Sequence, residues 1–182
     1  MKTNSNLIRA ACLLAFAGST ARAQAAMSDA TYDSAKDQLK AAYKIERDAC
    51  NTLAGNAKDI CVETAKGREN VALAHLQVQH TGAQKDMVKL AEARYDARFE
   101  VAKEVCDDRT GNDKDVCMKE AKAMHEKAKA EVKMNKEIRE ARNEAEETKM
   151  KADYKVAAER CDSLTSDAKD ACVATAKARF GQ

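Results

Sequence analysis

The residues of this sequence with the clearest chemistry are its cysteines. Beyond position 23 they fall into three pairs, and ten residues separate the two members of each pair: Cys50 and Cys61, Cys106 and Cys117, and Cys161 and Cys172. Paired cysteines suit either disulfide formation or metal binding. Zinc sites place their cysteines much closer together along the chain. The spacing therefore favours disulfide bonds, which form in oxidising compartments.

Each cysteine pair lies in a repeated unit of sequence. Lys-Asp stands just before the second cysteine, Ala-Lys follows it, and an aromatic residue stands seven positions before the first: Tyr43, Phe99 and Tyr154. The first cysteines recur at intervals of 56 and 55 residues. The sequence therefore contains an internal repeat, with units near 43–66, 99–122 and 154–177. We expect the three aromatic side chains to anchor the core beside each disulfide.

The repeated unit is typical of two helices joined by a tight turn. Gly55 and Gly111 suit a left-handed residue at a helix end, and Ser166 in the third unit predicts a looser turn. The residues that follow are candidate N-caps: Asn56, Asn112 and Asp167. In an unbroken helix the two cysteines would lie about 16 Å apart, too far to bond. A turn between them favours pairing within each unit, although cross-links between units one and three stay open.

Between the turns, the composition is typical of long helices. The chain lacks proline and is 34% charged. We expect four helices, at 29–53, 57–109, 113–164 and 168–179, with a possible break in the second near Gly82. A narrow seam recurs every three or four residues: Ala121, Met124, Ala128, Val132, Asn135 and Ile138. The expected fold is all-α, an elongated antiparallel bundle of helical hairpins with two central helices of about 50 residues and with turns one and three at the same end.

The first 23 residues resemble a secretory signal peptide. Lys2 and Arg9 precede a short apolar run that contains Cys12, and Ala21-Arg22-Ala23 is a cleavage signal. We expect 24–182 to form the mature helical repeat region, located in the periplasm. This region has 29 Lys and Arg against 30 Asp and Glu. Such a balance gives no basic patch for nucleic acid, and we expect no membrane span after signal removal.

The remaining residues with chemical potential do not form a recognisable catalytic set. We interpret His75, His80 and His125 as solvated surface residues. The scattered methionines are typical of gap-fillers in an Ala-rich core: Met87, Met118, Met124, Met134 and Met150. No Ser-His-Asp set, phosphate loop or carboxylate pair is present in the sequence. We therefore expect no enzyme activity, no cofactor and no metal site.

The repeated unit resembles a motif of uncharacterised secreted proteins of proteobacteria. The motif is C-[DN]-x-L-x-[GS]-[ND]-A-K-D-x-C-V-x-T-A-K, and the middle unit departs from it at Arg109 and Asp113. These proteins are helical and rich in Ala, Lys and Glu, and some carry a generic cell-envelope or TolA-like label. The resemblance implies a periplasmic location and helical hairpins, and it implies no activity.

We therefore expect a structural or protein-interaction role in the cell envelope, with another protein or a second copy as the partner. One alternative is a periplasmic holdase chaperone that shields unfolded proteins during stress. The weaker alternative is a binder of metal ions or small molecules.

Overall fold

The computed structural model describes residues 27–181, and the predicted signal peptide with Cys12 lies outside these residues. The described chain is all-helical, as expected, with a short 3-10 helix η1 after the first α-helix. The elements are α1 (Asp29–Ala49), η1 (Cys50–Thr52), α2 (Asn56–Thr81), α3 (Gln84–Asp107), α4 (Gly111–Cys161) and α5 (Ser166–Phe180). Three of the four expected helices correspond to α1, α4 and α5, but the expected helix 57–109 is two helices.

The break in that helix lies at Gly82. The sequence had left open whether the helix continues through this residue or ends near it. Gly82 has a positive φ of 60° and its N–H donates to the carbonyl of Val78 at 2.8 Å, which ends α2. The side chain of Thr81 then accepts from the N–H of Ala83 at 3.1 Å and donates to Asp86 at 2.8 Å. Because these bonds close a tight reversal, α3 runs back along α2.

Asp86 is the most deeply buried charged residue described, with 2% of its surface exposed. Its carboxylate accepts from Thr81 and pairs with Lys89 at 3.1 Å. The hydrogen bond from Thr81, followed by the bond from Lys89, lowers the pKa of Asp86 below its ordinary value. The reversal between α2 and α3 is therefore held by an ionised carboxylate.

The three stapled turns share a positive φ at the same position of the repeat. Gly55, Gly111 and Ser166 have φ of 57°, 57° and 51°. The prediction of a looser turn at Ser166 is wrong, because the serine adopts the positive φ of the two glycines. The expected caps are also displaced. Asn56 is already the first residue of α2, and its side chain donates to the carbonyl of Glu104 at 2.6 Å.

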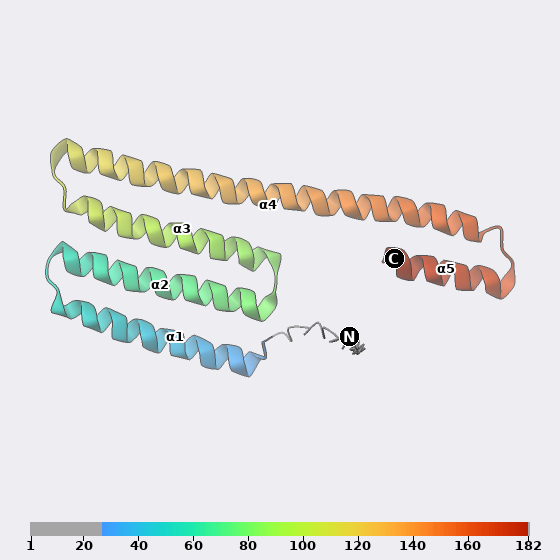
Figure 1. Ribbon diagram of the computed structural model, residues 1–182, viewed down its shortest axis with the longest axis horizontal. Coiled ribbons are helices and arrows are strands. Elements are labelled where there is room, and N and C mark those ends of the chain that lie inside the picture. Colours follow the sequence, from blue (N-terminus) through green and yellow to red (C-terminus); the bar gives the residue numbers. More distant parts are fainter. Residues whose placement is uncertain (1–26, 182) are drawn as a thin grey trace, which may run out of the picture.

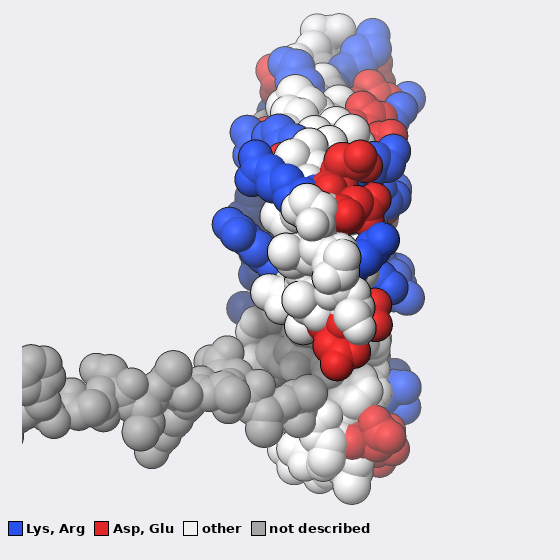
Figure 2. All heavy atoms as spheres, turned by 90° about the vertical axis from the view of Figure 1, so that its right-hand side faces the viewer, with Lys and Arg blue, Asp and Glu red and all other residues white. Residues whose placement is uncertain are grey.

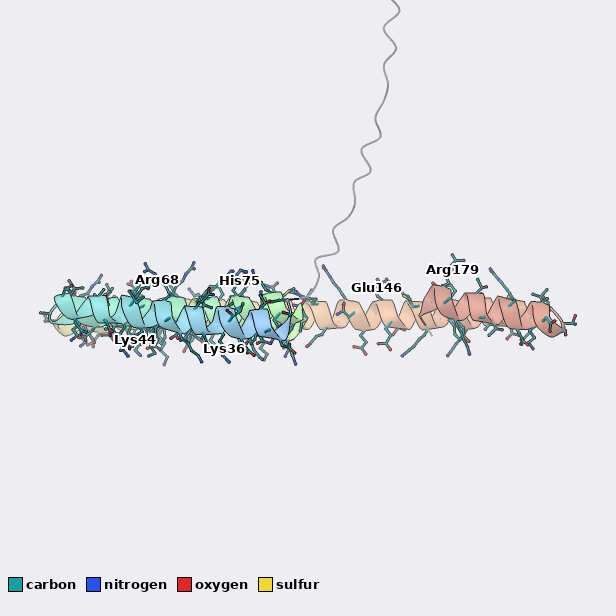
Figure 3. All side chains as sticks on the ribbon, turned by 90° about the horizontal axis from the view of Figure 1, so that it is seen from below. Lys36, Lys44, Arg68, His75, Glu146 and Arg179 are labelled. Carbon is teal, nitrogen blue, oxygen red and sulfur yellow. A yellow bond between two sulfur atoms is a disulfide. The ribbon has the colours of Figure 1, made fainter. Side chains whose placement is uncertain are left out.

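The helices lie side by side in a single layer (Figure 1). Within residues 27–181, contacts between α-helices join only chain neighbours: α1 with α2, α2 with α3, α3 with α4, and α4 with α5. Seen from below, the layer is one helix thick (Figure 3). The antiparallel, elongated character is confirmed, but the layer replaces the bundle that we expected.

The placement of the turns also differs from the expectation. The α1–α2 and α3–α4 turns lie at one end of the layer, and the α4–α5 turn lies at the other (Figure 1). The reversal at Gly82 is the physical reason, because it adds one change of direction between the first turn and the third. Only α4, with 51 residues, has the length that we expected of two central helices.

A single layer has little core, and what it has consists mostly of small residues. Ala65, Leu76, Leu90 and Ala121 are buried. In contrast, every residue from 140 to 149 of α4 is exposed, between the part packed on α3 and the part packed on α5. Ion pairs along the helix surface support this stretch, such as Lys149 with Glu146 at 2.8 Å.

Candidate interaction surface

The six cysteines within residues 27–181 form three disulfide bonds, each within its own repeat unit. The bonds join Cys50 to Cys61, Cys106 to Cys117, and Cys161 to Cys172, with Cα separations of 5.7, 5.6 and 5.7 Å. The local pairing is thus confirmed. The first cysteine of each pair is at most 1% exposed. Because buried disulfides are inert, these are structural staples rather than reactive sites.

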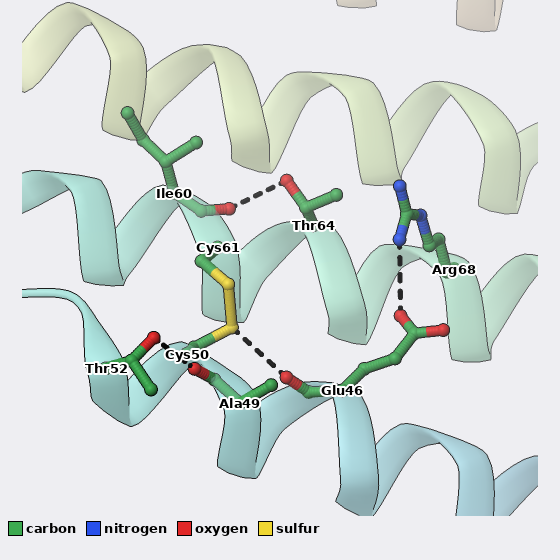
Figure 4. The surroundings of a disulfide bond; sticks show 8 residues. All are labelled: Glu46, Ala49, Cys50, Thr52, Ile60, Cys61, Thr64 and Arg68. Carbon is green, nitrogen blue, oxygen red and sulfur yellow. Dashed lines mark hydrogen bonds and ion pairs between the residues drawn. A yellow bond between two sulfur atoms is a disulfide. The ribbon is translucent and has the colours of Figure 1, made fainter.

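The surroundings of the first staple show how it fixes two helices (Figure 4). The Sγ of Cys50 lies 3.3 Å from the carbonyl oxygen of Glu46, a contact in which the oxidised sulfur has no proton to donate. Arg68, about two helical turns beyond Cys61 in α2, pairs with the carboxylate of Glu46 at 3.4 Å. The disulfide and this ion pair hold α1 and α2 in register.

Two of the three histidines join helices, so the interpretation of solvated histidines is wrong for them. His125 of α4 stacks on Phe99 of α3 at 4.5 Å between ring centroids, and its Nε2 lies 2.6 Å from Asp96. Phe99 is the aromatic residue of the second repeat unit, and it thus packs as an interhelical anchor. Lys129 also lies 3.7 Å from Asp96.

His80 makes a similar junction between α2 and the start of α1. Its ring packs at a tilt of 30° against the ring of Tyr32, with 4.5 Å between the centroids. Its Nε2 lies 3.3 Å from the carboxylate of Asp29, and its Nδ1 lies 3.1 Å from the carbonyl of Met27. Both ring nitrogens of His80 therefore face oxygen acceptors near the start of α1. His75, in contrast, is exposed as expected.

The methionines do not fill the core as expected. The side chains of Met87, Met124, Met134 and Met150 are 40% exposed or more. A layer one helix thick has no interior large enough to take them. Within residues 27–181, no group of three or more His, Cys, Asp or Glu side chains is placed to hold a metal ion.

One face of the layer carries a series of shallow grooves, one or more at each junction between helices. The α1–α2 and α2–α3 grooves share Arg68, and the α2–α3 and α3–α4 grooves share Arg98, so these grooves open on the same face. Arg179, in the α4–α5 groove, projects from the same side as Arg68 and His75 (Figure 3). We call this side the grooved face.

Arginine and lysine are distributed differently on this face. Six arginines line the five grooves: Arg68, Arg94, Arg98, Arg139, Arg160 and Arg179. Lys136 is the only lysine of the described chain that lines any of them. Figure 2, viewed from the α5 end, shows basic side chains along both edges of the layer, while most of the acidic ones lie in the centre and on the right, away from the grooved face on the left. Arginine is enriched and lysine depleted where proteins bind one another.

The α2–α3 groove is the most basic of these grooves and combines its arginines with an apolar floor. It has a volume of about 620 Å³, and its floor contains Gly67, Val71, Ala97 and Val101. Helices approach closely here, because a Cβ added to Gly67 would lie 2.8 Å from the Cβ of Ala97. The rim carries three arginines and one histidine and no acidic residue: Arg68, Arg94, Arg98 and His75.

The arginines on the α3 side of this groove are not neutralised by the described part of the chain. Arg68 pairs with Glu46 across the α1–α2 junction. Arg94 and Arg98 form no ion pair with any residue between 27 and 181. The guanidinium carbon of Arg98 lies 6.0 Å from the centroid of the Tyr95 ring, a cation–π contact. Both arginines are exposed. The groove therefore presents an apolar floor beside two free guanidinium groups.

Comparisons with models of protein families, with curated proteins and with solved structures find no match to this chain. Among the described residues, no helix combines the length and the apolar character needed to cross a membrane.

The sequence does not predict the α2–α3 groove. Arg94 and Arg98 are one helical turn apart, with Val101 following on the same face, and Arg68 and Val71 show a similar spacing. These two short patterns were detectable. Their meeting was not, because it depends on the reversal at Gly82, which lies between them in the sequence.

Proposed function

We propose that this protein is a non-enzymatic structural or interaction protein of the periplasm, exported through a cleaved signal peptide at residues 1–23. Three disulfides support an oxidising compartment. The resemblance of the repeat to secreted helical proteins of proteobacteria supports the same location.

The observation that carries the proposal is the open single layer. Each helix contacts only its chain neighbours, so both faces of the layer stay accessible. An enzyme encloses its substrate in a concave pocket lined by convergent polar groups. This layer instead offers long shallow grooves with arginine and exposed methionine, a composition typical of protein interfaces.

Site-specific photo-cross-linking in intact cells tests the proposal. A photo-reactive amino acid is placed at Val71 on the grooved face, at Lys44 on the opposite face and at Ala145 in the exposed stretch of α4. We expect a discrete cross-linked protein from at least one position with the disulfides intact. If the folded, exported protein gave no discrete product from any position on either face, the interaction role would be wrong.

A second candidate is a holdase chaperone, favoured by the exposed apolar side chains beside the grooves. Met124 and Val156 are 63% and 54% exposed and lie in the α3–α4 and α4–α5 grooves. A holdase would suppress aggregation of several unrelated unfolded proteins at near-equal molar ratio. An interaction protein would leave their aggregation unchanged and give one specific cross-linked partner.

Export itself is tested by mass analysis of the protein purified from periplasm. We expect an N-terminus at Gln24, because Ala21-Arg22-Ala23 provides the small residues that signal peptidase requires. A purified periplasmic protein that retained residues 1–23 would contradict this processing.

A further inference from the structure

We propose that the α2–α3 groove is the docking site for an acidic amphipathic helix of a partner protein. This inference rests on the proposed interaction role and names the surface and the chemistry of the partner. It is carried by the shape of the groove, by its charge and by the distribution of charge on the rest of the grooved face.

The shape of the groove fits a helix. Its α2 wall extends from Thr64 to His75, which corresponds to about 16 Å or three helical turns. The contact between Gly67 and Ala97 makes the floor shallow, and the groove is open to solvent along its length. A small ligand there would stay largely in water, whereas ligand pockets bury most of their ligand. A helix laid along the groove covers its floor with residues spaced three and four apart.

The charge of the groove selects an acidic helix. Arg68 stands on the α2 wall, and Arg94 and Arg98 stand on the α3 wall. A guanidinium group binds a carboxylate through two parallel hydrogen bonds. A docked helix with Asp or Glu on each side of its apolar stripe would pair with both walls, and the groove lining contains no acidic residue to compete.

The rest of the grooved face favours a partner helix over a membrane or a second copy. Acidic residues line the neighbouring grooves, including Glu46, Glu69, Glu131 and Asp153. An anionic lipid surface, which is flat and wide, would place these carboxylates against its headgroups together with the arginines, whereas a helix covers the α2–α3 groove alone. Two copies placed face to face on this groove would bring unpaired arginines together. The basic, apolar strip is confined to the width of one helix.

Binding of designed peptides to the oxidised mature protein tests the inference. The probe is a fluorescent helical peptide of about five turns, with leucines three and four apart and glutamates on both flanks. Its control replaces each glutamate by lysine. We expect the acidic peptide to bind, the basic control not to bind, and the affinity of the acidic peptide to fall as salt is raised.

Charge-reversal variants locate the site. Arg94→Glu with Arg98→Glu should weaken binding of the acidic peptide by about tenfold or more. The matched control is Lys36→Glu with Lys44→Glu, which changes the net charge equally on the opposite side of the layer (Figure 3). We expect the control to bind as the parent does. Arg94→Gln with Arg98→Gln is the second variant if the charge reversal prevents folding, and circular dichroism monitors the helix content of each.

Several results would overturn the inference. One is an equal loss of affinity for the acidic peptide in the two charge-reversal double variants. Another is binding of the acidic and the basic peptide with equal affinity. Binding of phosphatidylglycerol vesicles through Arg94 and Arg98, without peptide binding, would show a membrane site. Dimerisation that the Arg94 and Arg98 variant abolishes would show a second copy. In each case, a specific protein cross-linked at Lys44 or Ala145 would still support the interaction role. Failure of the groove proposal is therefore distinguishable from failure of the proposed function.

Discussion

Ser166 shows how much a single residue contributes to a turn in this molecule. The three repeat units adopt the same positive φ, yet two use glycine and the third uses serine. An L residue pays steric strain in this conformation because its Cβ approaches the backbone carbonyl. The repeat therefore retains one strained position, in the turn that connects the shortest helix.

Replacing that serine should stabilise the third hairpin. We expect Ser166→Gly to raise the free energy of unfolding by about 1 kcal/mol, since the relief of strain exceeds the extra entropy of glycine in the unfolded chain. The reciprocal control, Gly111→Ser, should lower it by a similar amount. Thermal unfolding of the oxidised proteins measures both. A destabilised Ser166→Gly variant would show that the serine side chain contributes more than its strain costs.

Asp86 should make the α2–α3 reversal sensitive to acid. Its pKa is lowered in the folded state, chiefly by the hydrogen bond from Thr81. Its contribution to stability is therefore present above the unfolded pKa of about 3.9 and is lost as the pH falls through the lower folded value. Asp86→Asn should destabilise the protein at neutral pH and unfold with less pH dependence in acid. Urea unfolding at neutral and acid pH tests this, and equal pH dependence in both proteins would contradict it.

At the scale of the helices, the sequence predicted local structure well and arrangement poorly. The cysteine spacing located all three stapled turns and glycine marked two of them, because those signals lie within a few residues. The direction of the third hairpin was not predictable in the same way. It depends on whether the chain reverses at Gly82, where one helix break changes which end of the layer the α4–α5 turn occupies. The groove was missed for the same reason, because α2 and α3 meet only after that reversal.

Gly67 should be the residue that sets the distance between α2 and α3. A Cβ at this position would lie 2.8 Å from the Cβ of Ala97, so Gly67→Ala must separate the helices or shift them. The overpacking cost of about 1–3 kcal/mol exceeds the gain in helix propensity of about 1 kcal/mol. We expect a net loss of about 1 kcal/mol, measured by urea unfolding. The double variant Gly67→Ala with Ala97→Gly exchanges the two side chains and should recover most of the loss.

At the scale of the whole molecule, the disulfides compensate for a small core. Helix α5 has 15 residues and packs only on α4. Helices of this length are marginal alone in water. The disulfide between Cys161 and Cys172 therefore matters most for keeping a helix attached.

Removal of single staples tests this ranking. Cys161→Ala with Cys172→Ala should leave the backbone amides of α5 without protection from hydrogen exchange, while α2 and α3 keep theirs. Cys106→Ala with Cys117→Ala should have a smaller effect, because α3 stays packed between α2 and α4. In the chain-entropy model each staple contributes about 3 kcal/mol. If α5 remained as protected as α3 without its disulfide, α4 packing alone would hold it.

The central claim is that the chain forms a single layer in which the first two stapled turns share one end and the third lies at the other. Pulsed electron paramagnetic resonance between spin labels on non-natural amino acids tests it directly and leaves the cysteines paired. Labels at Thr52 and Arg109 should give a distance of about 20–30 Å, two or three helix spacings. Labels at Thr52 and Leu164 should lie about 70 Å or more apart, near the length of α4. A short distance between Thr52 and Leu164, with a long one between Thr52 and Arg109, would show the bundle with an unbroken second helix instead.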